Sequence, residues 1–262
     1  MARIRLLDRL CRIYPDTQRE RLLAHVLCGE VRVGHERIRD PRALVSPDVP
    51  VSFETRQYVS RGGIKLEHAI DRWKLPVADA VMLDAGSSTG GFTDCLLQHG
   101  ARLVHAVDVG RNQLDYRLRA DERVSVHERT NLLDVHRLEP PALAAVADLS
   151  FRSLRTAASH LFALTGSNWA VLLLKPQFEW RGPPADFDGT VPDERLREIL
   201  TETLGALAGE ELPLADLCES PIRGAKGNRE FLLLVRDPQE GSPAQAGLPR
   251  IETLVTRALL TS

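Results

Sequence analysis

Unbroken apolar segments alternate with helix-like segments from residue 80 to residue 236, and this alternation limits the possible folds more than any other feature. Strands are expected at 80–86, 102–110, 124–130, 143–151, 169–178, 214–222 and 230–238. Helices are expected before and between them at 64–75, 89–100, 112–121, 153–165 and 191–209. Continuous apolar strands are typical of parallel sheets covered on both faces. The sequence therefore predicts an α/β, Rossmann-like, doubly wound fold with a mostly parallel sheet.

A smaller unit precedes this region. Two short helices are expected at 4–14 and 17–29, followed by two strands in EVRVGHERI with a turn at Gly34. We expect a small α+β domain at 1–55, a linker at 56–63, the α/β domain at 64–236, and a C-terminal linker and helix at 237–262. The last helix, 250–260, either packs back or stays mobile.

The charge is unevenly distributed. Residues 1–61 contain 12 Arg and 8 Asp or Glu, whereas the whole chain has a net charge of −2. A basic N-terminal unit favours contact with a polyanion, and a solvated helix face rich in Arg is the alternative. Charge alone leaves both interpretations open.

Several classes of protein are disfavoured. No apolar run of about 18 residues occurs, so no membrane span is expected. The first residues are too charged for a secretory signal. The four cysteines have neither zinc-site nor disulfide spacing, which favours reduced thiols in a cytoplasmic protein without a bound metal.

A glycine-rich turn follows the first strand, in VMLDAGSSTGGFT. It lacks the dinucleotide pattern G-x-G-x-x-G and the phosphate-binding pattern that ends in Lys. Asp84 beside small and hydroxyl residues better suits a zwitterionic amino-acid group, such as the methionine end of S-adenosylmethionine (SAM). An ordinary turn with capping residues is the alternative.

The next strands add residues suited to the rest of SAM. Asp108 lies 24 residues after Asp84, where an acid can hydrogen-bond both ribose hydroxyls, and Asn131 follows the third strand, where a side chain can contact adenine. The expected cofactor-binding residues are Asp84, Gly86, Ser87, Ser88, Thr89, Gly90, Gly91, Phe92, Asp108, Val109 and Asn131.

Together these motifs resemble the TlyA (hemolysin A) family. The resemblance rests on YVSRGGIKLEHA, LDAGSSTGGFTDCLLQHGA, AVDVGRNQLD, ERTN, ADLSFRSL, LLKPQFE and SPIRGAKGNREFLL, and it extends to about residue 236. It implies SAM-dependent 2′-O-methylation of ribosomal RNA by an FtsJ-like domain. It also implies that residues 1–54 form an RNA-binding module of the ribosomal-protein S-four type, the alpha-L motif, with rRNA or a ribosomal subunit as partner.

The resemblance further implies a catalytic tetrad of Lys65, Asp148, Lys175 and Glu230. A ribose hydroxyl is a poor nucleophile, so a base must take its proton; a lysine can do so when burial and a like-charged neighbour lower the pKa of its amine. Lys175 is the expected base, and Lys65 is expected to tune its charge and hold the hydroxyl. Asp148 is expected to position Lys175, and Glu230 to orient both lysines.

RNA contact is expected from Arg5, Arg9, Arg12 and Arg21, through shape and phosphate recognition. Tyr58 and Arg61 are expected to couple RNA docking to cofactor binding, with a simple hinge as the alternative.

The chain departs from the family pattern in two places. The loop at 180–194 is acidic and Pro-rich, and Arg111–Asn112 stands where a glycine is common. The altered loop motivates a second hypothesis, a catalytically silent RNA-binding or ribosome-assembly factor. A membrane-lytic protein, suggested by the family's older name, is the third. The sequence does not predict the modified nucleotide or the oligomeric state.

Overall fold

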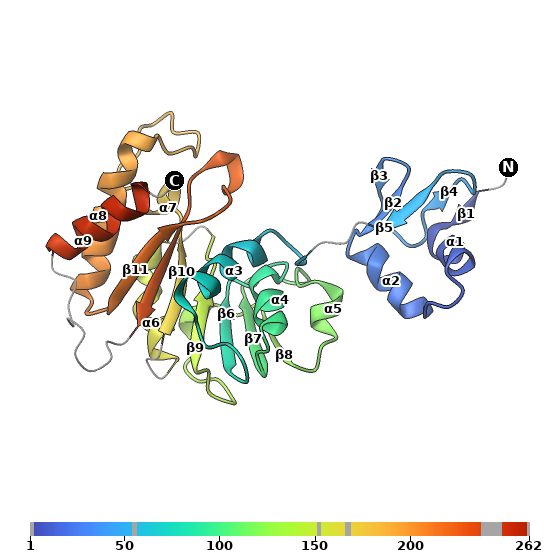
Figure 1. Ribbon diagram of the computed structural model, residues 1–262, viewed down its shortest axis with the longest axis horizontal. Coiled ribbons are helices and arrows are strands. Elements are labelled where there is room, and N and C mark those ends of the chain that lie inside the picture. The colour runs from blue at the N-terminus through green and yellow to red at the C-terminus, as the bar shows by residue number, and fades with distance from the viewer. Residues whose placement is uncertain (1–2, 54–56, 151–152, 166–168, 237–247, 261–262) are drawn as a thin grey trace.

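A computed structural model of the chain describes residues 3–53, 57–150, 153–165, 169–236 and 248–260. In Figure 1 the small N-terminal unit lies beside one end of a larger α/β unit. The expected linker and tail fall partly outside the described residues, at 54–56 and 237–247. The small unit consists of β1 (Ile4–Arg5), α1 (Leu6–Ile13), α2 (Arg19–Leu27), β2 (Val31–Val33), β3 (Glu36–Arg37), β4 (Leu44–Val45) and β5 (Val51–Phe53).

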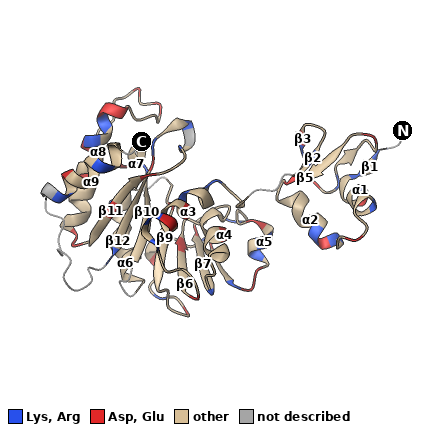
Figure 2. Ribbon diagram, in the orientation of Figure 1, with Lys and Arg blue, Asp and Glu red and all other residues tan. Residues whose placement is uncertain are grey.

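The small unit has its own core. Leu6, Leu10, Leu22, Val26 and Val31 are at most 1% exposed, and they join both helices to the antiparallel sheet β3-β2-β5. The first helix begins two residues later than expected, because the backbone of β1 pairs with β4. Exposed basic side chains lie on the helices of this unit (Figure 2).

The larger unit is built on a sheet that, among the described residues, has seven strands in the order β11-β12-β10-β9-β6-β7-β8. The strands are β6 (Val81–Ala85), β7 (Leu103–Asp108), β8 (Val124–Glu128), β9 (Ala144–Ala147), β10 (Trp169–Leu174), β11 (Leu214–Glu219) and β12 (Phe231–Arg236). The pairs from β10 through β8 are parallel, whereas β12 pairs antiparallel with β10 and β11. The predicted Rossmann-like sheet is confirmed, with an antiparallel strand pair at one edge.

Both faces of the sheet are covered by helices. Successive side chains of β10 enter opposite cores: Leu172 and Leu174 pack on one face, Val171 and Leu173 on the other, as period-two alternation requires. One core includes α3 (Gly62–Trp73) and α4 (Gly91–Gln98). The other includes α6 (Ala158–Ala163), α8 (Asp193–Gly209) and α9 (Leu248–Leu260). The shorter helices are α5 (Tyr116–Arg119), α7 (Pro176–Glu179), η1 (Leu132–Asp134), η2 (Leu154–Thr156) and η3 (Ala225–Gly227).

Two of the expected helices are shortened or divided. The helix expected at 112–121 is a single turn, α5, because Asn112 has a left-handed backbone and Asp115 caps the helix at a later position. The helix expected at 153–165 is divided into η2 and α6. Of the two alternatives expected for the C-terminal helix, the structure shows the first: α9 packs back on α8 and β11, with Ile251, Leu254 and Val255 buried.

No helix within the described ranges is both long enough and apolar enough to cross a bilayer. Within those same residues, no group of three or more His, Cys, Asp or Glu side chains is arranged to hold a metal ion.

Candidate active site

Polar residues meet at the carboxyl edge of the parallel strands. Asp84 and Asp108 lie at the ends of β6 and β7, and Asp148 and Lys175 directly follow β9 and β10. Neighbouring parallel strands end at the same edge, so residues distant in sequence come together there.

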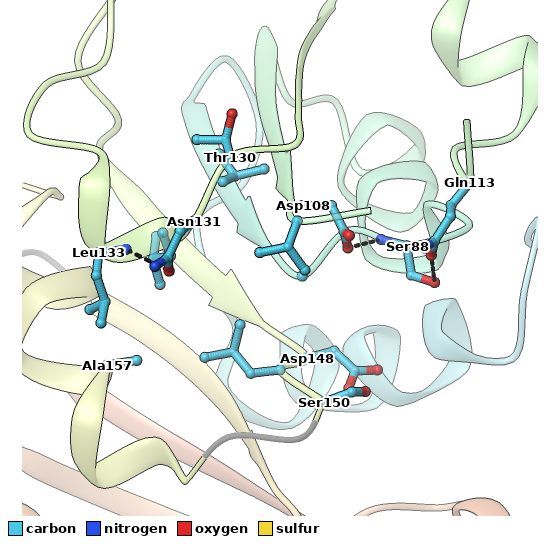
Figure 3. A pocket seen from close by; sticks show the side chains of 14 residues that line it. Ser88, Asp108, Gln113, Thr130, Asn131, Leu133, Asp148, Ser150 and Ala157 are labelled. Atoms are coloured by element: carbon cyan, nitrogen blue, oxygen red, sulfur yellow. Dashed lines mark hydrogen bonds between the residues drawn. The ribbon is translucent and has the colours of Figure 1, made fainter. Parts of the chain in front are cut away.

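Two adjoining cavities open at this edge, and both are lined by Gly86, Ser88, Asp148 and Ser150. Their volumes, about 300 and 390 Å³, are in the range of small-molecule sites. The first cavity, drawn in Figure 3, joins a polar side to an apolar side. Its polar lining is Asp108, Gln113, Thr130 and Asn131, and its apolar lining is Val107, Val109, Leu132, Leu133, Leu149 and Ala157.

Val109 is the most informative member of the apolar lining. Its side chain is 70% exposed, although it lies in the wall of a cavity. An exposed large apolar side chain beside other apolar groups favours a flat apolar ligand such as an adenine ring.

The acid at the end of β7 organises the first cavity. One carboxylate oxygen of Asp108 accepts from the backbone N–H of Ser88 (2.8 Å), and the other accepts from that of Gly110 (2.6 Å). A carboxylate has about four lone-pair positions, so Asp108 keeps capacity to accept from ligand hydroxyls. The side-chain oxygen of Asn131 accepts from the N–H of Leu133 (3.3 Å).

The turn after β6 is shaped for close approach. Gly86 has φ +80°, and a Cβ at this position would lie 2.6 Å from the carbonyl oxygen of Asp148. Any larger residue would therefore press the turn against the residue that follows β9 and narrow both cavities.

The second cavity brings the two expected lysines to one wall. It is lined by Ser60, Arg61, Gly62, Lys65, Gly86, Ser87, Ser88, Thr89, Gly91, Phe92, Asp148, Ser150 and Lys175. Lys65 and Lys175 are each only 8% exposed, although both amines are charged groups that burial disfavours.

Each buried lysine has its own carboxylate. Lys175 Nζ lies 2.5 Å from Asp148 Oδ1, and it donates to the carbonyl oxygen of Leu149 (3.2 Å) and to Ser150 Oγ (3.2 Å). Lys65 Nζ lies 2.5 Å from Glu230 Oε2. The structure therefore brings the four expected catalytic residues together as two ion pairs.

Glu230 lies behind Lys65 and lines neither cavity, being 3% exposed. Gly224 makes room for it, because a Cβ there would lie 2.0 Å from Glu230 Oε1. This position allows Glu230 to hold Lys65 but not to touch a ligand in either cavity.

Asp84 is fully buried and also lines neither cavity. One of its oxygens accepts from Thr93 Oγ1 (2.6 Å), and the other has no hydrogen-bond partner among the described residues. The pKa of Asp84 is raised to about 7, chiefly by burial; the hydrogen bond from Thr93 opposes this rise, and the nearby Asp148 adds to it. Asp84 therefore lies beneath the turn and does not reach either cavity. The direct contact with the cofactor ammonium that was expected from the sequence does not fit this position.

Gly90 is a second correction within the expected cofactor set. It has φ +97°, and a Cβ there would lie 2.3 Å from the Leu118 side chain, so this glycine allows the segment around α5 to pack on the start of α4. Sequence reasoning missed Ser60, Gln113, Thr130, Leu132, Leu133, Leu149, Ser150 and Ala157. Thr130, Leu149 and Ser150 lie two or three residues after the ends of β8 and β9, and that position was the available signal.

The expected RNA-binding arginines separate into two groups. Arg5, Arg12 and Arg21 are exposed. Arg9 is 8% exposed, and its guanidinium donates to the carbonyl oxygens of Ser46 (2.7 Å), Pro47 and Val49. The prediction for Arg9 is wrong, because its side chain holds the 46–49 loop against α1 and has no surface left for RNA.

Tyr58 is also misassigned as an RNA contact. It is 5% exposed, its hydroxyl donates to Glu67 (2.9 Å), and its ring fills the space beside Gly63, where a Cβ would lie 2.2 Å from the ring. Arg61, in contrast, is exposed and lines the second cavity.

The altered loop lies against the segment that leads to Glu230. The Asn228 side chain accepts from the N–H of Val191 (2.9 Å) and donates to the carbonyl oxygen of Gly189 (2.7 Å), and Lys226 donates to the carbonyl oxygen of Asp188. None of the described residues at 180–194 lines either cavity.

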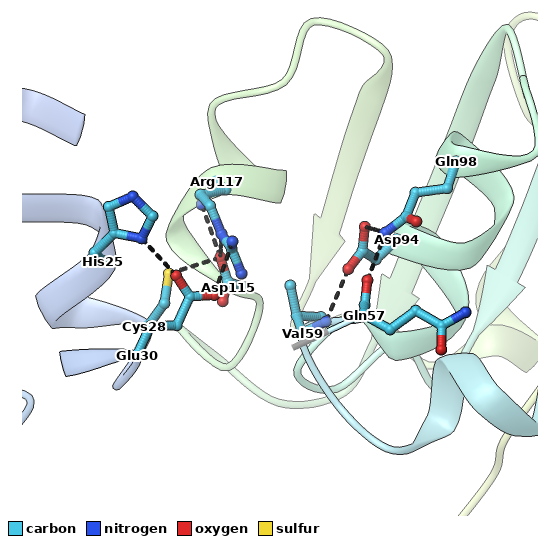
Figure 4. A network of polar contacts seen from close by, with 9 residues as sticks. All are labelled: His25, Cys28, Glu30, Gln57, Val59, Asp94, Gln98, Asp115 and Arg117. Carbon is cyan, nitrogen blue, oxygen red and sulfur yellow. Dashed lines mark hydrogen bonds and ion pairs between the residues drawn. The ribbon is translucent and has the colours of Figure 1, made fainter. Parts of the chain in front are cut away.

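A small polar network joins the two units (Figure 4). The Cys28 thiol donates to Asp115 Oδ1 (3.1 Å), and Arg117 pairs with Glu30 (2.9 Å). Burial, followed by the effect of Asp115, raises the pKa of Cys28 to about 12, so its thiol keeps the proton that it donates. Asp115 also reaches the turn of the second cavity, because its N–H donates to the carbonyl oxygen of Thr89 (3.1 Å).

Comparisons with known proteins agree with this geometry. The model of the FtsJ-like methyltransferase family matches residues 58–236. The chain is 40% identical over 248 residues to the "Putative rRNA methyltransferase YqxC" of Bacillus subtilis, covering 90% of this chain and 86% of that protein. It is 36% identical over 241 residues to the 16S/23S rRNA (cytidine-2′-O)-methyltransferase TlyA of Mycobacterium tuberculosis, covering 88% of each. A solved structure of a "Putative hemolysin" from Streptococcus thermophilus superposes with a TM-score of 0.67 at 32% identity, covering 98% of this chain and 96% of that one.

Proposed function

Because the chain belongs to the TlyA (hemolysin A) family of FtsJ-like methyltransferases, we propose that it methylates the ribose 2′-hydroxyl of a cytidine in ribosomal RNA, with SAM as methyl donor. The observation that carries this proposal is the wall of the second cavity. Two buried, carboxylate-paired lysines lie there beside the glycine-rich turn.

The residues present fit SAM. The apolar lining around Val109 suits adenine, and the Asp108 carboxylate suits the ribose hydroxyls. The close approach at Gly86 and the turn at Ser87–Thr89 would suit the amino-acid end, and this turn lines the same cavity as the two lysines. When bound, SAM supplies a methyl group on a positively charged sulfur.

The protein side of the reaction is positioning and proton removal. Asp148 fixes the amine of Lys175 in the wall of the second cavity, where a ribose hydroxyl can give up its proton. The Glu230–Lys65 pair places a second amine on the same wall, where it can hold the hydroxyl oxygen. Alignment of this kind can lower a barrier by about 7–11 kcal/mol in favourable cases.

RNA affinity is assigned to the small unit and to Arg61. The exposed Arg5, Arg12 and Arg21 offer charge for phosphates, and Arg61 lies at the second cavity itself. A base that leaves its stack would expose the ribose to that cavity.

The test is primer extension at low dNTP concentration on rRNA after incubation with SAM and the full chain. Wild type is expected to produce a new stop, and Lys175→Ala is expected to abolish it. Lys175→Arg keeps the positive charge but cannot accept a proton, since arginine stays protonated in proteins, so it is expected to be as inactive as the alanine variant.

Isothermal titration with SAM separates the alternatives. A catalytically silent RNA-binding factor would bind rRNA without binding SAM. A stop of unchanged strength in Lys175→Ala would remove Lys175 from the role of base, and wild type without any stop on either rRNA would contradict the function.

A further inference from the structure

The amine of Lys175 has three oxygen neighbours in the described structure. They are a carboxylate oxygen of Asp148 at 2.5 Å, the carbonyl oxygen of Leu149 at 3.2 Å, and Ser150 Oγ at 3.2 Å. The first contact is an ion pair, and the other two are hydrogen bonds that the amine donates. All three oxygens can accept from an ammonium, so the protonated side chain suits each of these neighbours.

A base, however, must present a lone pair. A neutral amine has two N–H groups and one lone pair, so one of the three neighbours must face the lone pair. A carboxylate and a carbonyl can only accept hydrogen bonds, whereas a serine hydroxyl can also donate. Ser150 is therefore the only one of the three that suits both protonation states of Lys175.

The position of Ser150 agrees with this role. It is exposed, and it lines both cavities. Asp148 also lines both cavities, but it follows β9 directly and its backbone N–H is bonded to the carbonyl oxygen of Ala85 (3.0 Å). Ser150 and Lys175 both line the second cavity, so a hydroxyl bound there can compete with Ser150 for the amine.

We propose that Ser150 is a positioning residue for the methyl transfer proposed above, on which this inference rests. Its hydroxyl donates to the neutral amine of Lys175 and keeps the lone pair directed toward the second cavity. The ribose 2′-hydroxyl replaces this donor when RNA binds, and its proton moves to Nζ. The resulting ammonium has three N–H groups, and Ser150 then accepts one of them.

The test compares wild type, Ser150→Ala and Ser150→Thr as full-length proteins. Transfer of tritiated methyl from SAM to rRNA gives kcat and KM, and calorimetry gives the Kd of SAM. Ser150→Ala is expected to lower kcat by about 10- to 100-fold, the scale of a small misplacement of a reacting group. The Kd of SAM and the KM of rRNA should change by less than about 3-fold, which would be below about 0.7 kcal/mol. Ser150→Thr retains the hydroxyl and should recover most of kcat.

Three outcomes overturn the inference while the proposed function stands. One is an active wild type with an equally active Ser150→Ala. Another is a loss of SAM affinity large enough to explain the fall in rate. The third is a threonine variant no better than alanine. A wild type that transfers no methyl group to rRNA would instead overturn the proposed function itself.

Discussion

The four lysines of this chain stand out against its thirty arginines. Arginine fills nearly every cationic position, including the buried Arg9. Lys65 and Lys175 are half of all lysines, and both have buried amines paired with carboxylates. A guanidinium would supply charge and hydrogen bonds at these positions but could not release its proton. The presence of lysine instead of arginine at these two positions therefore favours a role that requires an amine able to release a proton.

The raised pKa of Asp84 predicts how the stability of the fold depends on pH. Burial raises its pKa from the ordinary 3.8 to about 7, so between these values the folded protein holds a proton that the unfolded chain has lost. Stability must then fall as pH rises through this window and level off above it. Because one pKa unit corresponds to about 1.36 kcal/mol, the whole effect is roughly 4 kcal/mol.

Urea unfolding of wild type and Asp84→Asn from pH 4 to pH 8 measures this effect. The free energy of unfolding of the variant is expected to rise relative to that of wild type across the window, because asparagine has no proton to lose. Groups that are not coupled to Asp84 titrate equally in both proteins and cancel in the difference, so the remaining change reports on Asp84 and its neighbours Asp148 and Asp108. Two parallel curves would show that Asp84 ionises normally inside the fold.

Among the elements, helix α3 packs against residues 57 and 58, which begin the large unit. The ring of Tyr58 lies against Gly63 in its first turn, and Gln57 and Tyr58 both donate to Glu67 one turn later. Gly63→Ala would place a methyl 2.2 Å from the ring and should destabilise the protein by about 1–3 kcal/mol through overpacking.

Gly205→Ala in α8 is the matched control. No atom lies within 4 Å of a Cβ at this position, so alanine should stabilise the helix by about 0.5–1 kcal/mol. Thermal unfolding is expected to shift downward for Gly63→Ala and upward for Gly205→Ala. Shifts of the same sign would indicate that helix propensity, and not contact with Tyr58, governs position 63.

The regular elements were predictable because buried parallel strands read as apolar runs, and every expected strand of the large sheet is present. Arg9 was misassigned because charge was weighed before helix periodicity: it lies three residues after Leu6, on the same face of α1. Tyr58 was misassigned because the space that buries it is created by a glycine five residues later. Ser150 was missed because its role depends on the amine of Lys175, 25 residues away.

On the scale of the whole molecule, the two units meet at a contact that also touches the active site. Asp115 accepts from Cys28 of the small unit, while its own N–H donates to the turn that lines the second cavity. The contact around α5 (Figure 4) thereby relates the position of the proposed RNA-binding surface to that of the turn proposed to hold the cofactor. If the units keep this arrangement in solution, two thiols placed at this contact should react with each other.

Asp115→Cys tests that arrangement with the natural thiol of Cys28 as its partner. The Cys28 sulfur lies 3.1 Å from the Asp115 oxygen, close enough for a disulfide after small side-chain rotations. Mild oxidation is expected to remove two free thiols, and dithiothreitol to restore them. Asp115→Ser, which keeps a capping side chain for α5, should lose none, because the natural cysteines at 11, 28, 95 and 218 form no disulfide. If all five thiols of the oxidised Asp115→Cys variant stay free, the small unit does not remain in contact with α5 in solution. Binding of RNA would then have to bring the two units together.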